Sequence, residues 1–186
     1  IKVPGIEGGQ RCDAPVTGTD FYPTLLELTG APQKPEEHMD GVSLVPLLHG
    51  ESIKERALIW HYPHYGNQGG EPSGIIRLGE WKLIHYYEDR REELYNLDKD
   101  LEENFNVAES NPQLVLELSD KLFLMLEEMG ALYPVPDPEY SEEKEQEHLE
   151  HVIHNRWPKL EQQRMDFLSV DFDPGNKWWG SKVTND

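Results

Sequence analysis

The sequence predicts an α+β fold in which a small four-stranded antiparallel sheet packs against one long helix. Three observations lead to this prediction: short runs of strand-like composition, a two-residue hairpin signal between two of them, and one long amphipathic helix after the last run. The strand-like runs are residues 57–62, 75–78, 81–86 and 93–97. Because a sheet of this size needs one face covered to be stable, the long helix is expected to cover it.

Two helices are predicted before the sheet. The first begins at Thr19, which can cap free amides, has Pro23 in an early turn, and ends at Gly30. The second spans residues 41–50, with Ser43 as its cap. Their apolar stripes have nothing in this part of the chain to pack on. We therefore expect an exposed apolar patch, and such patches usually mark interfaces.

The centre of the chain has the period of β-strands. Residues 57–62 form the first predicted strand, and residues 63–73 form a loop that is long enough to be functional. Gly79-Glu80 joins the next two strands, and glycine in the first position favours a type II′ turn. Arg77 and Lys82 lie on adjacent strands and are expected to form ion pairs across the sheet. Their expected partners are Glu80, Glu88 and Glu93.

The helix that covers the sheet has clear signals at both ends. Asn111 is the predicted cap, Pro112 suits the first helical position, and Gly130 ends the helix. Apolar side chains recur at intervals of three and four residues, which places them on one face. They are Leu114, Val115, Leu118, Leu122, Met125, Leu126 and Met129.

The rest of the chain is predicted to be an acidic helix and an aromatic extension. Residues 133–138 are rich in proline and extended, and a charged helix runs from its cap at Ser141 to Asn155. From Trp157 onward we expect turns. The aromatic side chains of Trp178-Trp179-Gly180 are expected to latch onto a protein surface.

Composition excludes several kinds of partner. The chain has 186 residues, a hydrophobic content of 37% and a net charge of −19. Because nucleic acids and anionic membranes are bound by Lys and Arg, we expect neither as a partner. No transmembrane stretch and no signal peptide are visible. Cys12 is the only cysteine, so no internal disulfide is possible and the redox compartment stays open.

Five motifs follow one another between Val3 and Tyr140. They are the segment from Cys12-Asp13-Ala14-Pro15-Val16 to Gly30, Asp40-Gly41-Val42-Ser43-Leu44-Val45-Pro46-Leu47-Leu48, Arg77-Leu78-Gly79-Glu80-Trp81-Lys82-Leu83-Ile84, Glu93-Leu94-Tyr95-Asn96-Leu97 and Glu102-Glu103-Asn104-Phe105-Asn106-Val107-Ala108. In order and spacing they resemble the C-terminal portion of type I sulfatases, the arylsulfatase-like enzymes of the alkaline phosphatase superfamily. The resemblance implies that residues 1–56 are the tail of an alkaline-phosphatase-like α/β catalytic domain, residues 57–132 a sheet-and-helix subdomain, and residues 133–186 an extension. The chain is then the rear part of a larger enzyme.

The resemblance also implies where the chemistry lies. Sulfatases hydrolyse sulfate esters with a formylglycine, made from the first residue of Cys/Ser-x-Pro-x-Arg, beside a calcium ion. Near Cys12 the proline comes one place late and no arginine follows, so Cys12 is not expected to be a nucleophile. Asp13, Asp20 and Asp40 fall where the family has capping and turn residues. We predict no catalytic residue and no cofactor in this chain, which should be inactive alone. Calcium and formylglycine are expected in the parent enzyme.

Substrate contacts are predicted at the end of the first strand. The resemblance places His61, His64 and Tyr65 near the rim of the parent's cleft. An imidazole can donate a hydrogen bond to a sugar hydroxyl or a sulfate oxygen, and a tyrosine ring can face a pyranose. The alternative is that these side chains fill the seam between the sheet and the helix.

A second group of histidines lies in the charged helix. His148, His151 and His154 recur every three residues, so two of them could chelate zinc or nickel with a nearby carboxylate. The alternative is an ordinary exposed helix, which the Glu-rich surroundings favour. We predict no metal there.

Two functions follow from these patterns. In the first, the chain is the C-terminal part of a sulfuric ester hydrolase, with the upstream catalytic domain as its partner and a sulfated carbohydrate or aryl sulfate as the parent's substrate. In the second, it is a stand-alone acidic protein-interaction module that uses its N-terminal helix and aromatic tail. Self-association through the exposed N-terminal helix is a further expectation. The localisation stays open, although a periplasmic or secreted parent is expected from the resemblance.

Overall fold

The computed structural model describes residues 1–66, 70–173, 177–178 and 181–182 of the chain. The chain forms two compact units, residues 1–134 and residues 135–186. The first unit holds the sheet, the long helix and the short helices that precede them, and the second holds the acidic helix and the C-terminal end. The division that the sequence predicts at residues 56 and 132 stays a prediction.

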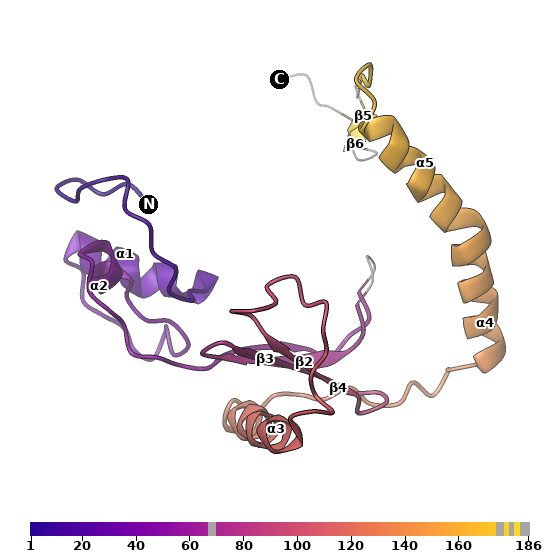
Figure 1. The fold of residues 1–186 in the computed structure, drawn as a ribbon, viewed down its shortest axis with the longest axis horizontal. Coiled ribbons are helices and arrows are strands. Elements are labelled where there is room, and N and C mark those ends of the chain that lie inside the picture. The colour runs from indigo at the N-terminus through magenta and orange to yellow at the C-terminus, as the bar shows by residue number, and fades with distance from the viewer. Residues whose placement is uncertain (67–69, 174–176, 179–180, 183–186) are drawn as a thin grey trace. The chain divides into compact units, whose positions relative to one another are not determined.

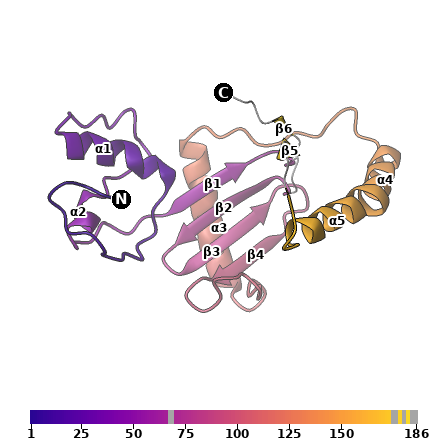
Figure 2. The same ribbon diagram turned by 90° about the horizontal axis from the view of Figure 1, so that it is seen from above.

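Four antiparallel strands form a meander in the order β1-β2-β3-β4; Figure 1 labels three of them, and Figure 2 shows all four in this order. They are β1 (Leu58–Tyr62), β2 (Ser73–Leu78), β3 (Trp81–Tyr86) and β4 (Glu92–Asn96). The register pairs Ile76 with Leu83 and Leu83 with Leu94, so these three side chains form a row on one face of the sheet. The predicted α+β fold with a four-stranded antiparallel sheet is confirmed.

The hairpin between β2 and β3 has the predicted turn. Gly79 has a φ of 56°, and the non-glycine residues with positive φ in the described part of the chain are Arg90 and Glu103. Glu80 therefore keeps a negative φ. A positive φ followed by a negative one is the pattern of a type II′ turn, which only glycine adopts readily in the first position.

The long helix α3 (Pro112–Glu128) lies across one face of the sheet (Figure 2). It starts after Asn111 and is followed by Gly130 at a φ of 67°, as predicted. The Asn111 side chain does not cap the helix. Its amide instead donates a hydrogen bond of 2.8 Å to the Val107 carbonyl, which closes the preceding turn.

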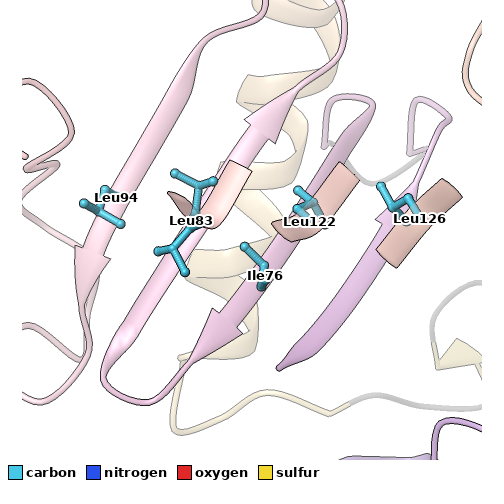
Figure 3. Packing of buried hydrophobic residues seen from close by; sticks show 6 residues of the cluster. Ile76, Leu83, Leu94, Leu122 and Leu126 are labelled. Carbon is cyan, nitrogen blue, oxygen red and sulfur yellow. The ribbon is translucent and has the colours of Figure 1, made fainter. Parts of the chain in front are cut away.

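The core lies between α3 and the sheet (Figure 3). Its buried members are Ile76, Leu83, Leu94, Leu118, Leu122 and Leu126. The three helical leucines were predicted to face the sheet. Met129 was predicted with them but is 48% exposed, because α3 ends at Glu128 and Met129 occupies the C-cap position.

The predicted ion pairs across the sheet are wrong. Lys82 pairs with Glu103 in the loop after β4, with Nζ 2.6 Å from the carboxylate. The register places Arg77 opposite Lys82, and like charges at opposite positions repel, so the lysine is better placed when it turns to the loop. Arg77 has no ion pair with any described residue, and its Nε is buried without a hydrogen-bond partner there.

The N-terminal segment contains η1 (Gly18–Asp20), α1 (Phe21–Thr29) and α2 (Val45–Leu48). Thr19 is not the cap of the first helix. A 3₁₀ turn precedes α1, and the Asp20 carboxylate accepts a 2.8 Å hydrogen bond from the Thr17 amide. Gly30 ends α1 with a φ of 70°, as predicted. In the second helix the N-cap is Leu44 rather than Ser43, whose hydroxyl accepts from the Val45 amide at 3.2 Å.

Helix α1 presents an apolar face within the first unit. Phe21 is 51% exposed and Leu25 is 57% exposed, as the sequence predicted for this stripe. Pro23 and Thr24 of the same helix are buried instead, and the Thr24 hydroxyl accepts a 2.8 Å hydrogen bond from the Leu44 amide. The helix is thus anchored through these two residues, while Phe21 and Leu25 stay exposed.

The second unit contains a longer helical run than predicted. It consists of α4 (Glu142–His151), a π-helical turn η2 (Val152–Arg156) and α5 (Trp157–Phe167) (Figure 1). Ser141 caps α4 through a 3.4 Å hydrogen bond from the Lys144 amide, as predicted. The predicted return to turns at Trp157 is wrong. Pro158 lies in the first turn of α5, directly after the π turn, where a missing amide hydrogen is tolerated.

The C-terminal end contains β5 (Lys177–Trp178), which pairs with β6 (Ser181–Lys182). Trp179 and Gly180, on which the predicted aromatic latch depends, lie outside the described residues. Among the residues that the structure describes, no helix has both the length and the apolar character that crossing a bilayer requires.

Candidate functional site

His61 lies near the end of β1 and binds two other segments of the chain. Its Nε2 is 2.9 Å from the Leu132 carbonyl oxygen and its Nδ1 is 2.7 Å from the Tyr87 hydroxyl. Because a carbonyl only accepts, Nε2 carries the hydrogen and Nδ1 of the neutral ring accepts from the tyrosine. Both ring nitrogens are therefore occupied by protein groups.

Two tyrosine rings pack against His61. Tyr87 and Tyr133 lie edge-to-face with the imidazole, at centroid distances of 5.5 and 5.6 Å, and with each other at 5.5 Å. Burial raises the pKa of Tyr87 to about 12, so its hydroxyl keeps the proton that it donates to His61. This arrangement gives His61 the packing role in the seam between sheet and helix that the sequence left as an alternative.

His64 and Tyr65 lie in the loop after β1 and have separate contacts. His64 packs edge-to-face on Tyr62 at 5.3 Å, and alternation along β1 puts Tyr62 on the face opposite His61. Tyr65 is 63% exposed, and its hydroxyl donates to the Glu88 carboxylate. The three predicted residues thus share one strand end without forming one cluster. Their contact with substrate stays a prediction.

Gly74 leaves the space that Tyr87 occupies. A Cβ atom at Gly74 would lie 2.4 Å from the Tyr87 hydroxyl oxygen and 3.3 Å from a Leu122 methyl. The first distance is far below van der Waals contact. Glycine at this position of β2 therefore permits the hydrogen bond between Tyr87 and His61.

We expect Gly74→Ala to lower the free energy of unfolding by about 2–3 kcal/mol, because the methyl group overpacks the seam and displaces the Tyr87 hydroxyl. Urea denaturation followed by circular dichroism measures the loss. Gly18→Ala is the matched control, since a Cβ there meets nothing within 4 Å, and it should change stability by less than about 0.5 kcal/mol. Equal stability of the two variants would contradict the prediction.

Asp20 has several partners in the N-terminal segment that the sequence does not predict. Asp20 is fully buried, and its two carboxylate oxygens lie 2.6 and 2.5 Å from Nη2 of Arg56. The Val42 amide donates to the same carboxylate at 3.0 Å, and Arg56 also donates to the Asp40 carbonyl at 2.9 Å. No local signal predicts this pair, because 36 residues separate its members.

Gly41 permits the chain to approach Asp20. A Cβ at Gly41 would lie 2.3 Å from the Thr19 carbonyl oxygen, so only glycine fits between the two backbones. The motif that begins Asp40-Gly41-Val42 therefore positions an amide at a buried carboxylate. Because the Asp20 oxygens are already occupied by Arg56 and two backbone amides, this arrangement is structural.

A cavity of about 730 Å³ separates the N-terminal segment from the sheet. Its lining includes Lys54, Arg56 and Arg77, and also carboxylates of both segments. The Nε atoms of Arg56 and Arg77 are buried, with no hydrogen-bond partner among the described residues. Because charges of both signs line it, the cavity does not select for an anion.

The histidines of the second unit are exposed. His148 and His151 lie on α4 and His154 lies on η2, where the π turn changes the helical spacing. In the described part of the chain, no three side chains of His, Cys, Asp or Glu are grouped so that they could hold a metal ion. The absence of a metal site at these histidines stays a prediction.

Comparison with known proteins covers most of the first unit. Residues 1–129 match the family described as N-sulphoglucosamine sulphohydrolase, C-terminal. A sulfatase of Formosa agariphila is 37% identical over an alignment of 118 residues, and the match covers 55% of this chain and 21% of that protein. Arylsulfatase K of Danio rerio is 35% identical over an alignment of 127 residues, and the match covers 66% of this chain and 24% of that protein.

Solved structures agree with this match. One protein, solved in complex with its substrate D-glucosamine-2-N,6-O-disulfate, has a TM-score of 0.50 and 28% identity to this chain, and the match covers 58% of this chain and 23% of that one. The chain spans 21% and 24% of the length of the two curated relatives. The predicted resemblance to the C-terminal portion of sulfatases is confirmed, and the chain belongs to the family described as N-sulphoglucosamine sulphohydrolase, C-terminal.

Proposed function

We propose that this chain completes the fold of a sulfuric ester hydrolase and contributes residues to the rim of its substrate cleft. The match of residues 1–129 to a sulphohydrolase C-terminal family is the observation that carries this proposal. The relatives give no support to the alternative function as a stand-alone acidic interaction module. The activity is a property of the whole enzyme, of which this chain supplies the C-terminal part.

The formylglycine and the calcium ion of a sulfatase do not fit the residues of this chain. Cys12 is exposed, and its surroundings lack the proline spacing and the arginine of the formylglycine motif. Asp20 is paired with Arg56, and the described residues offer no metal-binding group. Both groups would therefore belong to the preceding part of the enzyme.

The exposed face of α1 would pack on that preceding part. Phe21 and Leu25 are each more than half exposed, and they belong to a helix that is anchored through the buried Pro23 and Thr24. An apolar face of this kind is stable when it is covered. The upstream catalytic domain is the partner that we propose, and self-association through the same face is the competing outcome for the chain alone.

The substrate class that we propose is a sulfated carbohydrate, with aryl sulfates as the second candidate. One structural relative was solved with a glucosamine that carries sulfate on nitrogen and on oxygen 6. In this chain, His64 and Tyr65 are exposed in the loop after β1 and can contact such a substrate. His61 would support the loop rather than the ligand, since its nitrogens are both occupied.

Kinetics of the full-length enzyme test the rim contact. We expect His64→Ala to raise KM for a sulfated sugar roughly tenfold and to leave kcat nearly unchanged, because the side chain would contribute binding in both the ground state and the transition state. His49→Ala, which removes another exposed histidine, is the control and should leave both constants unchanged. An unchanged KM in the His64 variant would show that this residue does not contact the substrate.

The gene and the isolated chain test the broader proposal. The reading frame ahead of Ile1 should encode a Cys/Ser-x-Pro-x-Arg motif, and the pure chain should not hydrolyse an aryl sulfate. A full-length reading frame without that motif, or genuine turnover by the pure chain, would overturn the proposal.

A further inference from the structure

A second cavity of about 380 Å³ opens beside the His61 cluster within the first unit. It is lined by His85, Tyr87, Arg90, Phe123, Tyr133 and Pro134. Its walls are aromatic rings and a proline, and its lining side chains carry an imidazole, a guanidinium and two tyrosine hydroxyls as polar groups. The volume is in the range of pockets that hold small molecules, and a few polar groups on mostly apolar walls are typical of such sites.

His85 is oriented by two further side chains. The buried Ser119 of α3 donates a 2.7 Å hydrogen bond to Oε1 of Glu92, and the same oxygen lies 3.0 Å from Nδ1 of His85. Because a carboxylate only accepts, Nδ1 carries the hydrogen, and in that neutral tautomer Nε2 is an acceptor. Among the described residues, Nε2 has no hydrogen-bond partner. The row Ser119, Glu92 and His85 thus holds in place an imidazole that lines the cavity and whose Nε2 can accept a hydrogen bond.

Ring contacts hold the imidazole in place. The Phe123 ring packs edge-to-face on His85 at 4.8 Å, and Tyr87 lies at 5.7 Å. Tyr133 closes the arrangement through its contacts with Tyr87 at 5.5 Å and Phe123 at 6.3 Å. The acceptor is therefore surrounded by ring surfaces that can cover the apolar face of a ligand.

Arg90 and Arg91 differ in their contacts. Arg91 is committed to the protein: it pairs with Asp89 at 2.6 Å and Glu71 at 3.0 Å, and its guanidinium lies 3.8 Å above the Tyr86 ring. Arg90 forms no ion pair or hydrogen bond with the described residues. It has a φ of 59°, an uncommon conformation for a side-chain-bearing residue, at the turn that leads to the cavity. Its charge is available to a ligand.

We propose that this cavity binds a pyranose ring that carries an anionic substituent. The apolar face of the ring would lie on Phe123 and Tyr133, a ring hydroxyl would donate to Nε2 of His85, and the anionic group would pair with Arg90. No bond is made or broken here; the site is a binding subsite. The choice of sulfate as the anionic group rests on the proposed function, whereas the geometry itself selects any anionic sugar.

Nuclear magnetic resonance titration of the 186-residue chain tests the proposal. The probes are N-acetylglucosamine 6-sulfate and the uncharged N-acetylglucosamine. We expect saturable shifts of the His85, Phe123 and Tyr133 ring signals, with the sulfated sugar bound roughly tenfold more tightly, as one charge-assisted contact provides. Equal affinity for the two sugars, or no ring shifts in a folded chain, would overturn it.

Two variants locate the site. Arg90→Asn removes the charge and keeps a residue that tolerates positive φ, and it should abolish the preference for the sulfated sugar. Arg11→Ala, which removes an arginine that is 87% exposed elsewhere in the unit, should retain the preference. Phe123→Leu should weaken both sugars equally while leaving the Arg90 effect intact. If Arg90→Asn keeps the full preference, the anion binds elsewhere and the proposal fails.

This test is independent of the one for the proposed function. If the chain binds no sugar in this cavity but the upstream motif and the KM effect of His64→Ala are found, the subsite proposal fails and the proposed function stands. If the chain binds the sugar but the reading frame lacks Cys/Ser-x-Pro-x-Arg, the subsite proposal stands and the proposed hydrolase function fails.

Discussion

Replacing Asp20 with alanine is expected to release residues 17–56 from their fixed structure. The change leaves the Arg56 guanidinium mostly buried with no carboxylate, and it removes the acceptor of the Thr17 and Val42 amides. Breaking one side of a buried ion pair costs about 3–5 kcal/mol. Because the Arg56 side chain is still 20% exposed and can be partly hydrated, we expect a loss of about 3 kcal/mol. This loss should be seen in amide hydrogen exchange as faster exchange of the amides of residues 17–56.

The exchange experiment has an internal reference and a matched control. Amides of β2, β3 and α3 should keep their protection, since the Asp20 contacts lie outside that core. Asp13→Ala removes a carboxylate that is 77% exposed, and it should leave the whole pattern unchanged. A double variant, Asp20→Ala with Arg56→Met, should recover part of the loss because no unpaired charge remains. Unchanged protection of residues 17–56 in Asp20→Ala would show that the pair does not hold the segment.

Leu122→Ala is expected to destabilise the sheet-and-helix core by about 3–4 kcal/mol. Leu122 is fully buried between α3 and the sheet, among Ile76, Leu83 and Leu94, and its truncation removes apolar contacts and leaves a cavity. The loss should appear as a lower midpoint of urea unfolding with an unchanged slope. Circular dichroism at a wavelength that reports helix follows the transition.

Leu124→Ala is the matched control, because it changes the helix propensity of α3 without removing a buried side chain. Leu124 lies two residues away on α3 but is 57% exposed, so the same substitution there changes the intrinsic helix preference and almost nothing else. We expect a change within about 0.5 kcal/mol. Similar losses at the two positions would mean that α3 does not pack on the sheet through the face that contains Leu122.

Secondary-structure elements that are determined by neighbouring residues could be predicted well from the sequence. The turn at Gly79-Glu80 and the ends of α3 depend on a few adjacent residues with special backbone preferences. The buried face of α3 follows from the helical period of its leucines. These signals need no knowledge of the rest of the fold, which explains why the sheet and its covering helix could be derived.

Contacts between distant residues could not be predicted. Asp20 and Arg56 are unremarkable as separate charges, and only the folded chain brings them together. Lys82 had closer carboxylates in the sequence than Glu103, yet the loop after β4 places Glu103 at its amine. The contact between His61 and the Leu132 carbonyl could not be predicted either, because it forms only when α3 has brought Leu132 to the end of β1. The continuation of the acidic helix was missed because Pro158 normally stops a helix and here follows a π turn.

The hydrogen bond between His61 and Leu132 joins the beginning of the sheet to the segment just after the long helix, 71 residues later. During synthesis on a ribosome, β1 emerges before Leu132, so this contact forms only after β2, β3, β4 and α3 have been synthesised. The sheet-and-helix core can therefore be closed by His61 only once the segment that follows α3 is available.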